Sequence, residues 1–141
     1  FQARFGKGAL ALKNAVDAGR FGAISWASAY VPWYRDEAYY ASAGWRGTWK
    51  LDGGGALMNQ SIHAIDMLLW LAGDVAEVSA RCGNVWHKSL EVEDTAMAWL
   101  QFKSGALGVI QGTTTAFPGE PKRVEIKGTK GSATLVDDMP T

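Results

Sequence analysis

Apolar residues recur at helical spacing in two segments of the N-terminal half of the chain. The first segment spans about residues 8–18 and ends at Gly19, which suits the left-handed conformation that often follows a helix. The second spans about residues 56–72 and ends at Gly73 and Asp74. Its apolar stripe at helical spacing consists of Met58, Ile62, Ile65 and Leu69. The pattern therefore predicts two amphipathic helices.

The rest of the ordered pattern is typical of strands. Residues 23–31 alternate Ile24, Trp26, Ser28 and Tyr30 with small side chains and stop at Pro32. Further strands are predicted over residues 76–85, 95–102, 106–115, 124–127 and 132–136. Short turns that contain glycine join the last four strands in pairs, and such strands pair antiparallel. Because the helices come early and the strands late, the fold class is α+β.

Aromatic residues gather in one segment, between positions 26 and 49. All four tyrosines and four of the seven tryptophans lie there: Tyr30, Tyr34, Tyr39, Tyr40, Trp26, Trp33, Trp45 and Trp49. Residues 32–55 have neither a period of 2 nor one of 3.6, so we expect a loop. A loop rich in Trp, Tyr and Arg is typical of a binding wall, because these side chains offer flat area with a polar end. A loop that closes over the core would have the same composition, and both interpretations stay open.

The densest polar cluster lies on the second predicted helix. Asn59, His63 and Asp66 follow one another at spacings of four and three, and so form a strip beside the apolar stripe, whereas Gln60 points further away. His63 either lines a cleft or is a buried histidine that Asp66 or Asn59 satisfies. Three glycines at residues 53–55 permit a close approach to the helix N-terminus, where anions are favoured.

Other polar residues give weaker signals. A metal-dependent hydrolase built on His63 and Asp66 needs a further ligand, such as His87 or Glu93, but the spacing does not indicate one, and we expect no metal site. We expect Cys82 to be a small buried side chain. Three acidic residues, Glu91, Glu93 and Asp94, are expected to be a solvated entry to a strand.

Composition narrows the function classes. A chain of 141 residues fits one domain. Lys and Arg total 14, as do Asp and Glu, so the net charge of zero argues against binding to nucleic acid or to a membrane surface. The single cysteine excludes an internal disulfide and fits a reducing compartment, and no apolar stretch is long enough to span a membrane. The N-terminal sequence has neither an initiator Met nor a signal-peptide pattern, so we expect a part of a larger cytoplasmic protein.

Two motifs in the chain resemble the signature of a known protein family. The run Trp45-Arg46-Gly47-Thr48-Trp49 and the run from Asp52 through the three glycines to Asn59-Gln60-Ser61-Ile62-His63-Ala64-Ile65-Asp66 resemble the signature of the Gfo/Idh/MocA oxidoreductases, in their second, substrate-binding domain. Further agreeing segments are residues 19–22, 33–35, 91–95 and 128–132. The resemblance covers essentially the whole chain.

The resemblance implies an open, mainly antiparallel sheet with helices packed on one face and a dimer contact on the other. It implies a dehydrogenase that uses NAD or NADP, bound mainly by an N-terminal Rossmann domain that this chain lacks. The substrate would be a hydroxyl of a sugar, cyclitol or nucleotide sugar. We therefore expect residues 1–141 to be a single C-terminal domain that is inactive alone. The alternative is a non-catalytic binding or dimerisation module of the same fold.

The resemblance also assigns roles to residues. His63 would be the catalytic base, and Asn59 stands where the family often has an aspartate; an amide can orient a hydroxyl but cannot take its proton. The Asn-Gln-x-Ile-His version resembles nucleotide-sugar dehydrogenases. The cofactor would contact Trp45 and Arg46. The residues expected to bind substrate are Tyr40, Trp49 and Gln60.

Overall fold

The first half of the chain forms helical elements before and after a single strand, and the second half forms strands. The computed structural model describes residues 1–137 and 139–140. Helical elements are η1 (Gln2–Phe5), α1 (Lys7–Asp17), α2 (Glu37–Ala41), the π-helical η2 (Ala56–Ser61) and α3 (Ile62–Ala72). Strands are β1 (Ile24–Pro32), β2 (Val75–Gly83), β3 (Thr95–Phe102), β4 (Leu107–Thr113), β5 (Arg123–Gly128), β6 (Gly131–Val136) and β7 (Met139–Pro140).

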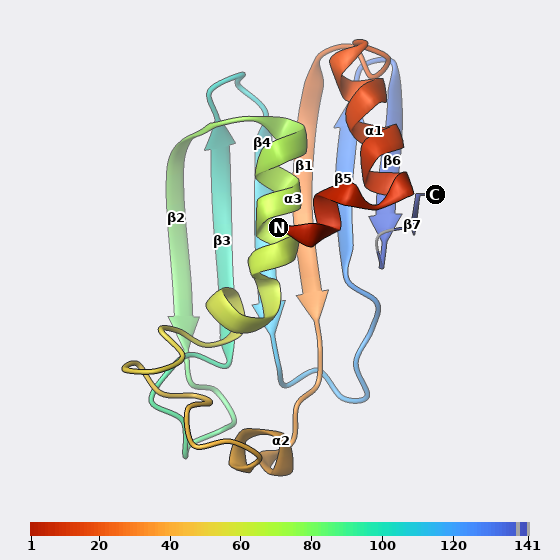
Figure 1. The fold of residues 1–141 in the computed structure, drawn as a ribbon. Coiled ribbons are helices and arrows are strands. Elements are labelled where there is room, and N and C mark those ends of the chain that lie inside the picture. Colours follow the sequence, from red (N-terminus) through yellow and green to blue (C-terminus); the bar gives the residue numbers. More distant parts are fainter. Residues whose placement is uncertain (138, 141) are drawn as a thin grey trace.

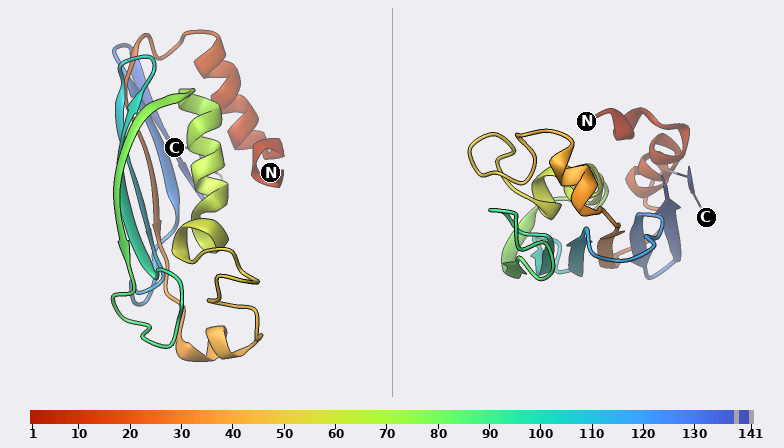
Figure 2. Two further views of the ribbon diagram at one scale, coloured as in Figure 1. Left: turned by 90° about the vertical axis from the view of Figure 1, so that its left-hand side faces the viewer. Right: turned by 90° about the horizontal axis from the view of Figure 1, so that it is seen from below.

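One sheet runs through the molecule, and α1 and α3 lie on the same face of it (Figures 1 and 2). The order of strands is β2-β3-β4-β1-β5-β6-β7. All pairs are antiparallel except β1 with β4, which are parallel. This confirms the predicted α+β class and the open, mainly antiparallel sheet with helices on one face. The parallel pair arises because β1, the first strand in the chain, lies between β4 and β5.

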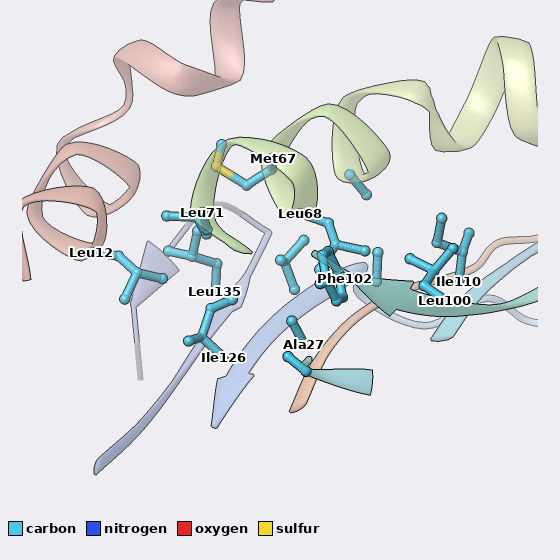
Figure 3. Packing of buried hydrophobic residues seen from close by; sticks show 14 of the residues in the cluster. Leu12, Ala27, Met67, Leu68, Leu71, Leu100, Phe102, Ile110, Ile126 and Leu135 are labelled. Atoms are coloured by element: carbon cyan, nitrogen blue, oxygen red, sulfur yellow. The ribbon is translucent and has the colours of Figure 1, made fainter. Parts of the chain in front are cut away.

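The small side chains of β1 are the ones that face the core. Ala27 and Ala29 are fully buried, whereas Trp26, on the other face, is 36% exposed. Small residues let α3 lie close above β1, and larger apolar side chains from α3 and the neighbouring strands fill the space on either side. Figure 3 shows this packing. Its labelled residues are Leu12, Ala27, Met67, Leu68, Leu71, Leu100, Phe102, Ile110, Ile126 and Leu135.

Two details of the strand prediction are wrong. Cys82 is exposed, because β2 is the edge strand of the sheet and its residues 76–82 are all exposed. The strand predicted to reach residue 85 ends at Gly83, since the carboxylate of Asp94 accepts hydrogen bonds from the backbone amides of residues 85–87 and bends the chain there.

The aromatic segment is mostly a loop over residues 32–55, as predicted, but this loop contains the short helix α2. Asp36 caps this helix by accepting a hydrogen bond from the backbone N–H of Tyr39 at 2.8 Å. The segment lies at the end of the sheet where β1 finishes, below the start of η2 (Figure 1). A helix that crosses a bilayer needs about 20 apolar residues, and no helix in the described part of the chain meets that requirement.

The parallel pairing of β1 with β4 leaves no room for a side chain at Gly108. A Cβ there would overlap the carbonyl oxygen of Ala27 and lie 2.9 Å from the ring of Phe102. We therefore expect Gly108→Ala to lower the free energy of unfolding by about 1–3 kcal/mol, measured by chemical denaturation. Gly83→Ala, where a Cβ meets nothing within 4 Å, is the matched control. Equal stability of the two variants would contradict this account of the β1–β4 contact.

Candidate functional site

The second predicted helix is continuous over residues 56–72, but it begins as a π-helix. η2 covers Ala56–Ser61, and α3 follows at once. A π-helix has i→i+5 hydrogen bonds, so residues four apart no longer lie directly above one another. The strip that α-helical spacing predicted for Asn59, His63 and Asp66 is consequently split, and each of the three side chains has different neighbours.

Glu93 fixes the start of this helix. Its carboxylate accepts hydrogen bonds from the backbone N–H groups of Gly55 and Leu57, both at 3.0 Å, and its carbonyl oxygen accepts one from Ala56 at 2.9 Å. Glycine is required at residue 55, because a Cβ there would overlap the carbonyl group of Glu93. The anion that the glycines and the helix N-terminus favour is thus a carboxylate of this chain, and the prediction of a solvated Glu93 is wrong.

Asn59 and Gln60 belong to a network that joins the helix to the aromatic segment. The Asn59 amide nitrogen donates to Asp52 Oδ1 at 2.8 Å, and the Asn59 oxygen accepts from Gln60 Nε2. Gln60 Nε2 also donates to the Tyr39 hydroxyl at 2.9 Å. Asp52 Oδ2 accepts from the backbone N–H of Gly47 at 2.9 Å, so one carboxylate ties the Trp45–Arg46 turn to the helix. Because Asp52 only accepts, the orientation of the Asn59 amide is fixed.

His63 lies apart from this network. Its ring is half-buried and contacts the ring of Phe1 edge-on, with 5.6 Å between the ring centroids. Its Nδ1 is buried without a partner, and neither Asn59 nor Asp66 bonds to it. Among the described residues, His63 is therefore neither paired with a carboxylate nor a buried histidine that Asp66 or Asn59 satisfies.

The other residues considered for a metal centre lie at separate places. Asp66 is 8% exposed and pairs with Arg4, whose Nε donates to its carboxylate at 2.8 Å. His87 is 1% exposed, and its Nδ1 lies 3.0 Å from Glu37. Hydrogen bonds from His87 and Ser89 lower the pKa of Glu37. Among residues 1–137 and 139–140, no three His, Cys, Asp or Glu side chains come together as metal ligands would.

The predicted binding residues of the aromatic segment differ in accessibility. Trp45 is 38% exposed and Trp49 is 58% exposed. The guanidinium of Arg46 stacks on two rings, 4.5 Å from the Trp45 ring centroid and 4.2 Å from that of Tyr39. Tyr40 donates its hydroxyl to Thr114 Oγ1 at 2.8 Å, and burial raises its pKa. The hydroxyl next to Gln60 belongs to Tyr39, which is not among the predicted binding residues.

The enclosed space at this end of the chain is small. A cavity lined by Tyr39, Tyr40, Asp52, Gly55, Asn59 and Gln60 offers only about 10 Å³, room for one water molecule. A sugar-sized ligand would therefore have to lie on the surface above these residues. His63 is not among the lining residues of this cavity.

Asp94 is a structural residue, and the prediction that it is solvated is wrong. It is fully buried. Burial by itself raises the pKa of Asp94, but hydrogen bonds from the amides of residues 85–87 and from the Thr95 hydroxyl outweigh it, so the pKa lies below its ordinary value. The same turn carries His87 to Glu37 on α2. Asp94 thus supports the segment on which Tyr39 stands.

Comparisons with known proteins agree with one another. A family model described as the GFO/IDH/MocA C-terminal domain matches residues 9–134. The chain is 36% identical, with a TM-score of 0.90, to the WlbA dehydrogenase of Bordetella pertussis in complex with NADH and UDP-GlcNAcA; the match covers 96% of this chain and 41% of that one. The corresponding enzyme from Chromobacterium violaceum, also with NADH and UDP-GlcNAcA, is 39% identical with a TM-score of 0.90, over 98% of this chain and 40% of that one.

Curated relatives are oxidoreductases. The myo-inositol 2-dehydrogenase of Thermotoga maritima is 39% identical over 83 residues, which are 55% of this chain and 25% of that protein. The uncharacterized oxidoreductase YrbE of Bacillus subtilis is 40% identical over 92 residues, 62% of this chain and 27% of that one. The chain thus spans about a quarter of the length of these relatives and about two-fifths of the solved structures.

The buried carboxylate of Asp94 predicts a loss of stability in acid. Because the pKa of Asp94 is lowered on folding, its contribution is present above the pKa of an unfolded aspartate and is lost as pH falls through the lower, folded value. Asp94→Asn should lower the free energy of unfolding at pH 7 by about 1–3 kcal/mol and weaken its dependence on pH below 4. Asp74→Asn, an exposed control, should change neither. An unchanged acid dependence in Asp94→Asn would contradict the assignment.

Proposed function

Since the chain belongs to the GFO/IDH/MocA family through its C-terminal domain, we propose that it is the substrate-binding and catalytic half of an NAD(P)-dependent dehydrogenase. Its relatives are dehydrogenases of sugars, nucleotide sugars and inositols, and several solved neighbours contain NADH. The nicotinamide cofactor would be held mainly by a Rossmann domain preceding this one. We propose that the chain has no turnover alone.

The observation that best supports the proposal is that the His63 side chain has no hydrogen-bond partner among the described residues. The imidazole is half-buried, and neither of its ring nitrogens has a hydrogen-bond partner among the described residues. The unperturbed pKa of a histidine lies near neutrality, so a free imidazole nitrogen can take the proton of a substrate hydroxyl at working pH. His63 would be that base. Asp66 would not assist it, because Arg4 already pairs with this carboxylate.

The cofactor would meet this chain at the turn that carries Trp45 and Arg46. The indole of Trp45 is partly exposed, and Nη2 of Arg46 donates to no described residue, so both can contact a bound molecule. When bound, the nicotinamide supplies a hydride acceptor. The groups of this chain orient the substrate and remove its proton.

A nucleotide sugar is the substrate class that we favour. Asn59 retains one unused amide hydrogen, since its amide nitrogen carries two and donates one to Asp52, whereas Gln60 Nε2 uses both of its hydrogens on Asn59 and Tyr39. The unused hydrogen of Asn59 can orient a sugar hydroxyl at the surface above the small cavity, with Trp49 as exposed stacking area. The solved neighbours with UDP-GlcNAcA support this class.

A non-catalytic assembly module is the second candidate, favoured by the uncovered face of the sheet. The helices leave this face of the sheet uncovered (Figure 2). Strand register and burial place exposed apolar residues of neighbouring strands on it. They are Trp26, Met97, Trp99 and Leu107, which are 36%, 54%, 48% and 50% exposed. Exposed apolar area of this kind marks protein contacts. We propose that this face forms a homo-oligomer contact, which is compatible with catalysis at the other side of the sheet.

The dehydrogenase proposal is tested with the chain alone and with the chain joined to an upstream dinucleotide-binding half. We expect NAD-dependent oxidation of a nucleotide sugar, followed by NADH absorbance, only in the joined protein. His63→Asn should lower its kcat/KM by about 10²–10⁴-fold, because the general base is lost. Asp74→Asn, remote and exposed, is the control. The proposal would be refuted if His63→Asn turned over substrate as fast as the wild type. It would also be refuted if the joined protein formed no NADH with any sugar substrate offered.

A charge placed on the uncovered face of the sheet tests the proposed homo-oligomer contact. Trp99→Lys should convert the wild-type oligomer to monomer in sedimentation velocity, since an unpaired lysine in an apolar interface is costly to desolvate. Val78→Lys is the matched control: Val78 is 62% exposed and lies beside Ile65 and Leu69 on the helix side of the edge strand. A monomeric wild type, or an oligomer that tolerates Trp99→Lys, would exclude this interface.

A further inference from the structure

The hydroxyl of Tyr39 is a hydrogen-bond donor without an acceptor. Its oxygen accepts from Arg46 Nη1 at 2.6 Å and from Gln60 Nε2 at 2.9 Å, which uses both acceptor positions of a phenol oxygen. The hydroxyl hydrogen then has no acceptor among the described residues. Tyr39 lines the small cavity beside Asn59 and is half-buried, so this donor lies at the proposed substrate site.

Two guanidinium groups flank the same ring. The centre of the Arg46 guanidinium lies 4.2 Å from the Tyr39 ring centroid, and that of Arg35 lies 5.1 Å from it. Arg35 also stacks on Trp33 at 5.0 Å. Stacking on aromatic rings holds these planar cations in place without neutralising them.

Neither cation has a carboxylate partner in the described part of the chain. Elsewhere, Arg4 pairs with Asp66 and Arg123 pairs with Glu125. Near Tyr39, by contrast, Asp36 caps α2, and Asp52 accepts from Gly47 and Asn59.

Donors on both cations are also unused. Arg46 employs Nε on Ser42 and Nη1 on Tyr39, which leaves Nη2 free. Arg35 donates from Nη1 to the carbonyl oxygen of Tyr34, and its Nε is buried without a partner. A buried donor without an acceptor is costly, so an arriving oxyanion would stabilise the cluster.

We propose that Tyr39, Arg46 and Arg35 form the binding site for an anionic oxygen group of the substrate, either a sugar carboxylate or the diphosphate of a nucleotide sugar. The inference rests on the proposed function, since it concerns the substrate of that site. The Tyr39 hydroxyl and Arg46 Nη2 donate to the oxyanion, and Arg35 adds the second positive charge. Guanidinium groups suit this task, because their planar donors match carboxylate and phosphate oxygens. Neutral polyols would bind this site poorly.

Calorimetric titration of the chain with three ligands tests the site. UDP-GlcNAcA carries a carboxylate and a diphosphate, UDP-GlcNAc carries the diphosphate alone, and N-acetylglucosamine carries neither. Tyr39→Phe removes the donor, Arg46→Lys and Arg35→Lys keep the charge without the planar fork, and Arg20→Lys on an exposed turn is the matched control. Thermal unfolding of each variant checks that it is folded.

We expect both anionic ligands to bind more tightly than N-acetylglucosamine, and Tyr39→Phe and Arg46→Lys to weaken anionic binding by about 10- to 100-fold while Arg20→Lys does not. A wild-type preference for UDP-GlcNAcA over UDP-GlcNAc that the variants lose identifies the carboxylate as the group. Equal binding of both nucleotides, weakened in the variants, identifies the diphosphate.

The proposal is overturned if the wild type binds none of the ligands, if it binds all three equally, or if the folded variants bind as Arg20→Lys does. Its failure can be told from failure of the proposed function. Unchanged affinity in Tyr39→Phe together with lost turnover in His63→Asn refutes the oxyanion site and leaves the dehydrogenase standing. Oxyanion binding by a joined protein that shows no NAD-dependent turnover supports the oxyanion site and refutes the dehydrogenase proposal.

Discussion

The contact between Glu93 and the first residues of η2 determines the geometry of the whole functional end of the molecule. The carboxylate accepts from Gly55 and Leu57, and the adjoining carbonyl accepts from Ala56, so the strand that begins at Thr95 is tied to the helix start by three hydrogen bonds. The contact is possible only because residue 55 has no side chain. It places a negative charge at the helix N-terminus, where the backbone N–H groups and the dipole favour one.

The π-helical start separates two kinds of chemistry. Asn59 and Gln60, within η2, reach toward the aromatic segment, where Tyr39 joins them to Arg46. His63 lies on the α-helical continuation and is left without a partner. The proposed base, His63, and the Asn59–Gln60 network are thereby held on one continuous helix but with different neighbours. In such an arrangement the proposed substrate contacts can change without disturbing the proposed base.

The structure pairs some of its charges completely and leaves others open. Arg4 on η1 pairs with Asp66 on α3, and the carboxylate of Asp94 accepts hydrogen bonds from three backbone amides. These groups stabilise the fold. The cations around Tyr39 have stacking partners but no counter-charge among the described residues. Since an unpaired charge near the interior is costly, the contrast distinguishes the proposed binding groups from the structural ones better than residue type does.

Periodicity alone determined the helices at residues 7–17 and 56–72 and most strands, because burial of one face leaves a repeat of 3.6 or 2 in a single stretch of sequence. The motif also pointed to Asn59, Gln60 and His63. Only the tertiary structure decided that β1 pairs parallel with β4, and that Tyr39 rather than Tyr40 faces Gln60. The tertiary structure also gives Glu93 and Asp94, which were predicted to be solvated, hydrogen bonds that stabilise the fold. These outcomes depend on hydrogen bonds between segments that lie tens of residues apart in the sequence. A local sequence pattern does not show which distant partner a polar side chain will contact.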